Sequence, residues 1–244
     1  MHRDTVALEH HSGWLQITIT REEKRNALDR HTRMLLCVAL QAARGTARAI
    51  VLTGSGASFC AGLDLKERAA EIAAGCSDTA GEEAIALNMA LREHPAVLIA
   101  AVNGLALGGG VTLVNSCDLA LASTQASFAC PEIRSGSYAS MAGPTSQLLL
   151  TRKRAAWLLL ADERIDAATA ERWGLVNEVI APAELLPRAH ALAERIASYD
   201  SGAIAETKRA LNHLPASSAP AQWRAAMDYG QTVGAAIRAH ARSE

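Results

Sequence analysis

The sequence predicts a mixed α/β fold that ends in a purely helical region. Through the first two-thirds of the chain, short apolar segments with the patterns of strands alternate with segments whose apolar residues recur at helical spacing. Beyond Val179-Ile180 every segment has helical periodicity. The 244 residues are enough to bury one large core. We therefore expect an α/β core over residues 1–190 and a C-terminal helical region over residues 191–244.

The expected strands are short, and most of them are continuously apolar, as strands buried on both faces are. The first two flank His10-His11-Ser12-Gly13, which has the composition of a hairpin connection. A later strand leads into Gly54-Ser55-Gly56. The expected strands are residues 6–8, 14–20, 49–53, 97–102, 119–122 and 127–129.

Helices are expected where apolar residues recur every three to four positions between a capping residue and a helix breaker. Asp29 precedes the first such segment and Gly45 ends it, while Asp166 and Gly174 bound a later one. After Asp64 the sequence loses clear periodicity until residue 82. Beyond the first helix, the expected helices are residues 82–94, 109–116, 167–173, 184–198, 202–213 and 222–241.

Charge and composition exclude several classes of partner. The formal net charge is −1, and the chain has only two Phe, three Tyr and four Trp. No basic run is present, so we expect no nucleic-acid surface and no binding to anionic membranes. No stretch reaches the roughly 20 apolar residues needed to span a bilayer.

The five cysteines and eight histidines lack the spacing of a disulfide framework or a metal site. We therefore expect no metal, and we expect the cysteines to be small buried side chains. The N-terminus lacks the charged-then-apolar pattern of a signal peptide, which favours a cytoplasmic protein.

The densest glycine cluster is Gly104-Leu105-Ala106-Leu107-Gly108-Gly109-Gly110, which lies between a buried strand and a helix. Glycines let the backbone approach a ligand closely, and the free N–H groups at a helix start favour negative charge. Such groups suit an oxyanion that develops during a reaction. A tight turn would need glycines as well. The dinucleotide-binding and P-loop patterns are absent, because Val-Thr-Leu follows and no acidic ribose partner or P-loop lysine is suitably placed.

Two further segments carry groups that could take part in binding or catalysis. In the segment from Ser58 to Lys66, small residues expose backbone donors, and Asp64 could serve simply as a helix cap. In Ala129-Cys130-Pro131-Glu132-Ile133-Arg134, Glu132 is either a solvated loop residue or, given partners, an acid or base. Nucleophilic catalysis is disfavoured, because no GxSxG elbow is present.

These segments, in this order, resemble the crotonase family, also called the enoyl-CoA hydratase/isomerase family. The similarity covers about residues 5–213, and five segments carry it: Arg21 through Asn26-Ala27-Leu28, Phe59-Cys60-Ala61-Gly62-Leu63-Asp64-Leu65, Ala101-Val102-Asn103-Gly104-Leu105-Ala106-Leu107-Gly108-Gly109-Gly110, Pro131-Glu132-Ile133, and Trp173-Gly174-Leu175-Val176-Asn177-Glu178-Val179. The resemblance implies a spiral of ββα units with a C-terminal helical part that supports homotrimers or dimers of trimers. It also implies an acyl-CoA substrate and no cofactor, since coenzyme A is part of the substrate.

The resemblance further implies an oxyanion hole made by the backbone N–H groups of Leu63 and Gly109. These donors would polarise the thioester carbonyl and stabilise an enolate, and a carboxylate would then move a proton. The other residues implied to bind substrate are Lys24, Arg25 and Ala27 along the CoA path, Ala61, Asp64 and Leu65 near adenine and pantetheine, and Tyr138 in the loop after Glu132.

The sequence departs from the pattern of the family at the positions of the two catalytic glutamates. Hydratases of the family use two glutamates, of which Glu132 matches the second, while Thr112 stands where the first should be. The loop of residues 137–143 is also altered and supplies no replacement carboxylate. We therefore favour an enzyme with Glu132 as its single acid/base and lean toward double-bond isomerisation. A hydratase in which Thr112 helps to hold the water remains an alternative, as does a catalytically silent CoA-binding or assembly protein.

Overall fold

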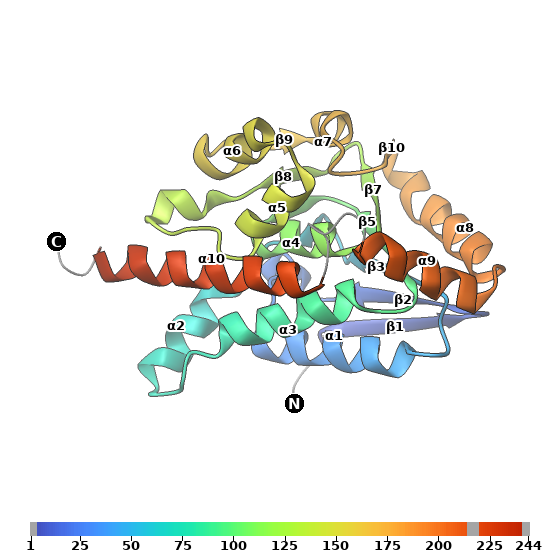
Figure 1. Cartoon of the computed structure of the whole chain (residues 1–244), viewed down its shortest axis with the longest axis horizontal. Helices are drawn as coiled ribbons and strands as arrows, with labels where there is room; N and C mark the ends of the chain where they lie inside the picture. The colour runs from blue at the N-terminus through green and yellow to red at the C-terminus, as the bar shows by residue number, and fades with distance from the viewer. Residues whose placement is uncertain (1–3, 214–219, 241–244) are drawn as a thin grey trace.

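The computed structural model describes residues 4–213 and 220–240, which fold around two sheets (Figure 1). The six-stranded sheet has the order β1-β2-β3-β5-β7-β10, and the four-stranded sheet has the order β4-β6-β8-β9. β1 and β2 pair antiparallel as a hairpin, and the larger sheet is otherwise parallel. The strands are β1 (Val6–His11), β2 (Trp14–Ile19), β3 (Ala49–Gly54), β4 (Ser58–Cys60), β5 (Val97–Val102), β6 (Leu105–Leu107), β7 (Leu119–Ser123), β8 (Ser127–Ala129), β9 (Ile165–Asp166) and β10 (Glu178–Ile180).

The helices are α1 (Arg30–Ala43), α2 (Leu65–Ala73), α3 (Ala80–Arg92), α4 (Gly109–Ser116), α5 (Ala142–Leu149), α6 (Arg152–Leu160), α7 (Ala167–Trp173), α8 (Leu185–Ala197), α9 (Ser201–His213) and α10 (Pro220–His240), with short 3-10 turns η1 (Glu22–Lys24), η2 (Pro131–Ser135) and η3 (Pro182–Glu184). Three of the helices, α2, α4 and α5, each follow a pair of strands that consists of one strand from each sheet. The successive units β3-β4-α2, β5-β6-α4 and β7-β8-α5 therefore repeat one ββα pattern. The predicted α/β spiral is confirmed.

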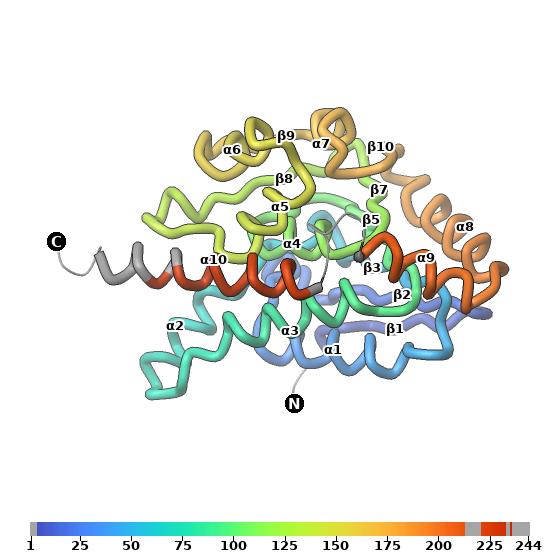
Figure 2. Tube along the Cα trace, viewed as in Figure 1, coloured from blue at the N-terminus to red at the C-terminus, as the bar shows by residue number. Residues whose placement is uncertain are grey.

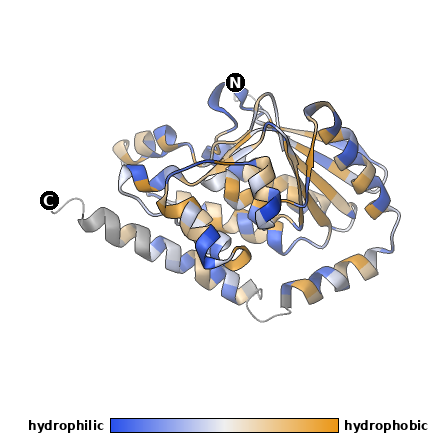
Figure 3. Ribbon diagram, turned by 90° about the horizontal axis from the view of Figure 1, so that it is seen from above, coloured by the Kyte–Doolittle hydropathy of each residue, from blue (hydrophilic) through white to orange (hydrophobic). Residues whose placement is uncertain are grey.

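Both faces of the six-stranded sheet are buried, which explains its continuously apolar strands. In β3, Ile50 and Leu52 face the main core, whereas Ala49 and Val51 face the inner side of α8. Side chains alternate along a strand, so neighbouring residues of β3 enter two different cores. The strands at the centre of the molecule are accordingly coloured mainly as hydrophobic (Figure 3).

Most predicted elements are confirmed, including the caps. The side chains of Asp29 and Asp166 accept hydrogen bonds from Thr32 N and Thr169 N, and Gly174 ends α7 in the left-handed conformation. The structure also contains α2, where the sequence showed no periodicity. Asp64 caps α2 through a hydrogen bond from Glu67 N, but no residue of α2 is buried, so its apolar residues do not pack into the core. The helices α5 and α6 were not predicted.

The C-terminal helices pack on the core in different ways. α8 lies on the six-stranded sheet, so the boundary predicted near residue 190 falls inside a helix that belongs to a core cluster. Lys208 of α9 forms a buried ion pair with Asp118, at 2.7 Å. α10 crosses the molecule between α3 and α5 (Figures 1 and 2), and its Trp223 and Met227 pack with Ile85 of α3. An oligomerisation role for this region stays a prediction.

The described part of the chain bears on two expectations from composition, one about membrane-spanning segments and one about the cysteines. No helix within residues 4–213 and 220–240 is long and apolar enough to cross a membrane. All five cysteines are free. Cys60, Cys117 and Cys130 are buried as expected, Cys37 is half-buried, and the expectation is wrong for Cys76, which is exposed.

Candidate active site

Three adjacent parallel strands of the four-stranded sheet bring the three chemical segments together. β4 pairs with β6, and β6 pairs with β8, all in parallel. Parallel strands end at the same edge of a sheet, so the residues that follow the three strands meet there. These residues are Ala61–Leu63 after β4, Gly108-Gly109 after β6, and Pro131-Glu132 after β8.

The first two segments touch backbone to backbone. Gly62 has φ +85°, and a methyl group on it would lie 2.7 Å from Leu107 O and 3.0 Å from Gly109 N. A methyl group on Gly109 would lie 3.2 Å from Gly62 Cα and 3.5 Å from Leu63 N. Side chains at either glycine would force the segments apart. The glycines therefore bring two backbone N–H groups close together.

Leu63 N–H and Gly109 N–H are both available to a ligand. Gly109 is the first residue of α4, where backbone N–H groups have no partner inside the helix. Neither N–H donates a hydrogen bond to any residue in the described part of the chain. The positive end of the α4 dipole adds to the attraction for an oxyanion. The two donors predicted from the sequence thus lie side by side.

Glu132 faces this pair of donors from the next strand exit. Gly108, with φ +48°, has no room for a methyl group, because that group would overlap Glu132 Oε1. The other oxygen, Oε2, is buried and has no hydrogen-bond partner among the described residues. Burial raises the pKa of Glu132 above its ordinary value, although a hydrogen bond from its own backbone N–H lowers it in part. Such a carboxyl group can both accept and return a proton near neutral pH.

A pocket of about 220 Å³ opens over these groups. Its lining includes Leu63, Gly109 and Glu132, together with three of the predicted substrate-binding residues, Ala61, Leu65 and Tyr138. Glu132 is the only carboxylate among the described residues that line it. Tyr138 is half-buried, its hydroxyl accepts a hydrogen bond from Gln147 Nε2 at 3.3 Å, and burial raises its pKa.

Thr112 does not line the pocket. Its side chain is fully buried in α4, and its hydroxyl donates to Gly108 O at 3.3 Å, one helical turn earlier. A hydroxyl bound back to the helix is not directed at a ligand. The structure therefore gives no support to Thr112 as the holder of a water.

Four predicted substrate-binding residues lie beside the pocket without lining it: Lys24, Arg25, Ala27 and Asp64. Lys24 and Arg25 are exposed, and the loop that carries them is hydrogen-bonded to the β4 exit through Ala61 N and Arg25 O, at 2.9 Å. Ala27 is buried, and its carbonyl accepts from Arg21. The carboxylate of Asp64 caps α2 and pairs with Arg21 at 3.0 Å, which leaves it a structural role.

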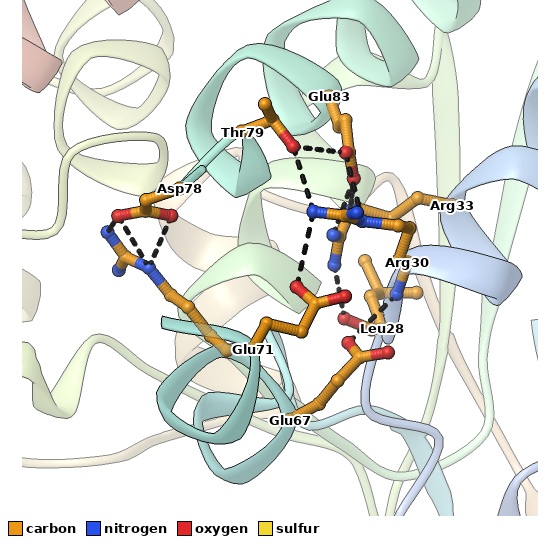
Figure 4. Close-up of polar contacts among 9 residues, drawn as sticks. Leu28, Arg30, Arg33, Glu67, Glu71, Asp78, Thr79 and Glu83 are labelled. Carbon is orange, nitrogen blue, oxygen red and sulfur yellow. Dashed lines mark hydrogen bonds and ion pairs between the residues drawn. The ribbon is translucent and has the colours of Figure 1, made fainter. Parts of the chain in front are cut away.

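An ion-pair network that the sequence did not indicate joins α1, α2 and α3 (Figure 4). Arg33, whose side chain is 3% exposed, pairs with Glu83 at 2.6 Å and donates to Leu28 O. Arg30 pairs with Glu71 and Glu83, at 3.2 Å each. Arg33 also lines the pocket. Desolvation alone would raise the pKa of Glu83, but hydrogen bonds from Thr79 and Arg33 and the nearby charges of Arg33 and Arg30 together hold it below its ordinary value.

Three more polar residues line the pocket, although no sequence motif predicted them. They are Arg68 of α2, Asn88 of α3 and Gln231 of α10. A methyl group on Gly81 of α3 would lie 2.8 Å from both the Nε2 and Oε1 atoms of Gln231. Residue 231 lies far from the motifs along the chain, so only the folded structure brings it to the site.

Comparison with known proteins identifies the family. Residues 9–235 match the model of the enoyl-CoA hydratase/isomerase family. The chain is 35% identical to the mevalonyl-coenzyme A hydratase of Aspergillus fumigatus, over 92% of this chain and 87% of the relative. It is 37% identical to a probable enoyl-CoA hydratase of Rhodobacter capsulatus, over 89% and 85% of the two chains. The solved enoyl-CoA hydratase/isomerase of Xanthobacter autotrophicus superposes with a TM-score of 0.86 at 28% identity, over 97% of this chain and 88% of that one. The chain belongs to the enoyl-CoA hydratase/isomerase family, as its motifs had suggested.

Proposed function

We propose that the protein acts on an acyl-CoA thioester, with Leu63 and Gly109 as the oxyanion hole and Glu132 as the single acid/base. One observation carries this proposal: two unpaired backbone N–H groups line the same pocket as a lone carboxylate, one oxygen of which is buried without a hydrogen-bond partner. A thioester oxygen bound by both donors would gain negative charge as the enolate forms. Stabilisation of this kind is commonly worth about 100- to 1000-fold in rate for each donor.

The reaction that a single carboxylate supports best is double-bond isomerisation. Glu132 takes a proton from the α-carbon, and the electron pair moves onto the thioester oxygen. The carboxylic acid then returns the proton to the γ-carbon as the double bond shifts. No second acid is needed, which matches a pocket whose described lining holds one carboxylate.

Hydration is the second candidate, and the names of the curated relatives favour it. Here a water oxygen bonds to the β-carbon and its proton passes to Glu132. The electron pair of the double bond moves onto the thioester oxygen, and Glu132 then protonates the α-carbon. This route needs a further group that holds the water, and the hydroxyl of Thr112 is bound to Gly108 O instead.

Substrate binding outside the pocket follows from the same proposal. The exposed Lys24 and Arg25 would act as counter-charges for the phosphates of CoA. Ala61 and Leu65 would contact the thioester arm. CoA enters as part of the substrate, so no separate cofactor is proposed, and we propose a homotrimer or dimer of trimers as the assembled form.

The test is Glu132→Gln, with Glu163→Gln as the matched control. Glu163 is an exposed glutamate that does not line the pocket. We expect Glu132→Gln to abolish turnover of 2-enoyl- and 3-enoyl-CoA substrates while butyryl-CoA binding stays nearly unchanged, and Glu163→Gln to behave as wild type. Full activity in Glu132→Gln would overturn the proposal. Binding without turnover by the wild-type protein, across chain lengths, would identify a silent CoA-binding protein instead.

A further inference from the structure

Asn88 is a buried carboxamide that faces the reaction pocket from α3. Its side chain lines the pocket that Glu132 lines, and the residue is only 4% exposed. A buried polar group in a ligand pocket is costly unless hydrogen bonds satisfy it. Its hydrogen bonds therefore indicate what the pocket is built to accept.

Two fixed contacts set the orientation of this amide. Asn88 Oδ1 accepts from Ser116 Oγ at 2.8 Å, and Asn88 Nδ2 donates to Ala84 O at 2.7 Å. The reverse orientation would put the amide oxygen against the carbonyl of Ala84, so the contacts fix which end carries nitrogen. The Nδ2 group has two N–H bonds, and only one is used by the residues that the structure describes.

The other polar side chains of the pocket are less suited to hold an uncharged oxygen there. The two arginines are engaged by carboxylates, Arg33 by Glu83 and Arg68 by Asp78. The serines of the pocket, Tyr138 and Gln231 are half-buried or exposed. Asn88 thus combines near-complete burial, a fixed orientation and an unused donor.

We propose that the unused N–H of Asn88 binds the oxygen that the acyl group carries at its β-carbon, as the water or hydroxyl of the hydration reaction. Asn88, on the facing helix α3, would thus hold the water that the sequence analysis assigned to Thr112 of α4. Ser116 links the two positions, because its hydroxyl lies 2.8 Å from both Thr112 O and Asn88 Oδ1. The inference rests on the proposed acyl-CoA function and favours hydration, its second candidate, over isomerisation, with 2-enoyl and 3-hydroxyacyl thioesters as the substrates.

The chemistry balances with Glu132 as the only proton carrier. In the hydration direction, the water held by Asn88 gives its proton to Glu132 as its oxygen bonds to the β-carbon. The proton then passes from Glu132 to the α-carbon. Asn88 supplies a hydrogen bond throughout and exchanges no proton.

The experiment compares binding of 3-hydroxybutyryl-CoA and butyryl-CoA, in a Glu132→Gln background that prevents turnover. These ligands differ by the β-oxygen alone. We expect 3-hydroxybutyryl-CoA to bind about tenfold more tightly, and Asn88→Leu to bring the ratio of the two dissociation constants close to one. Asn88→Ala, which adds no bulk, replaces Asn88→Leu if the larger residue prevents folding.

Asn115→Leu is the matched control. Asn115 is 3% exposed and bonded to Thr145 and Ser146, but it does not line the pocket, so this variant should keep the tenfold preference. Equal binding of the two ligands without the Asn88 change, or a preference that survives it, would overturn the inference alone. Failure of both ligands to bind would overturn the proposed acyl-CoA function as well.

Discussion

The floor and the cover of the pocket are built in opposite ways. The floor consists of the strand exits, where Gly62, Leu63 and Gly109 pack backbone against backbone and Gly108 lies against the carboxylate of Glu132. The cover consists of α1, α2, α3 and α10, which meet through side chains. These include the ion pairs of Arg33 and Arg30 in Figure 4 and the contact of Gln231 with Gly81.

This contrast in packing determines where the site tolerates substitution. The donors of the floor cannot move without moving a strand exit, because Gly62 and Gly109 pack against backbone atoms. A cover atom lies at the end of a flexible side chain, which can rotate at little cost. Fixed donors suit a developing oxyanion, whereas an adjustable cover suits acyl groups of different shape. Substitutions on the floor should therefore cost far more activity than similar substitutions on the cover.

The largest effect is expected for Gly108→Ala. Its methyl group would overlap Glu132 Oε1, so the carboxylate must shift from its place beside the oxyanion hole. Displacement of a catalytic group by about 1 Å commonly costs on the order of 100-fold. We expect kcat to fall about 100- to 1000-fold in steady-state assays.

Gly174→Ala separates this displacement from backbone strain. Gly174 also has positive φ, +80°, but no atom lies within 4 Å of the place where its methyl group would be. This variant should lose some stability and keep its kcat. Equal losses of kcat in the two variants would mean that strain, and not the contact with Glu132, causes the effect.

The pH dependence tests the burial of Glu132. Because burial raises its pKa, the acidic limb of kcat/KM should have its midpoint above the ordinary glutamate value of about 4.3. Activity should fall more than tenfold as the pH drops well below that midpoint. A midpoint at or below about 4.3 would contradict a carboxylate shielded by the floor.

The same pKa shift has a consequence for stability. A carboxyl group whose pKa is higher in the folded state stabilises the fold below its unfolded pKa and loses that contribution as the pH rises through the folded value. Glu132→Gln should therefore be more stable than wild type at neutral pH. Thermal unfolding at several pH values would measure this difference.

Glu83→Gln probes the cover. The change leaves Arg33 buried with a weaker partner, and it also weakens the pairing of Arg30. Since Glu83 is 30% exposed, solvent reduces the cost, and we expect a loss of about 1–3 kcal/mol in the free energy of unfolding. Asp228→Asn, which breaks an exposed pair with Arg224, should change it by less than about 0.5 kcal/mol.

The smallest effect is expected for Gly81→Ala. The added methyl group meets only the flexible end of Gln231, which can rotate into the pocket or toward solvent. We expect kcat/KM for a short enoyl-CoA to change less than about threefold. A loss as large as that of Gly108→Ala would show that the cover is as rigid as the floor.

The floor could be predicted from the sequence and the cover could not, for a physical reason. Gly62 and Gly108 have positive φ and no room for a methyl group, and Gly109 is tightly packed, so the chemistry of the floor leaves a local pattern in the chain. Helix packing brings Asn88, Arg33 and Gln231 to the pocket, and no short motif predicts how these helices pack. α2 was not predicted, since none of its residues is buried and its sequence therefore needs no clear apolar periodicity. Thr112 was assigned by its place in a motif, yet its hydroxyl bonds within α4.

The roles of Glu132 and the floor donors are tested most directly by the exchange of the α-protons of butyryl-CoA in deuterium oxide, which NMR can monitor. This measurement asks whether Glu132 removes an α-proton while the floor donors hold the thioester oxygen, whichever product the enzyme makes. We expect wild-type protein to catalyse the exchange and Glu132→Gln to reduce it at least about 1000-fold. Equal exchange by the two proteins, or none by the wild type, would contradict these roles.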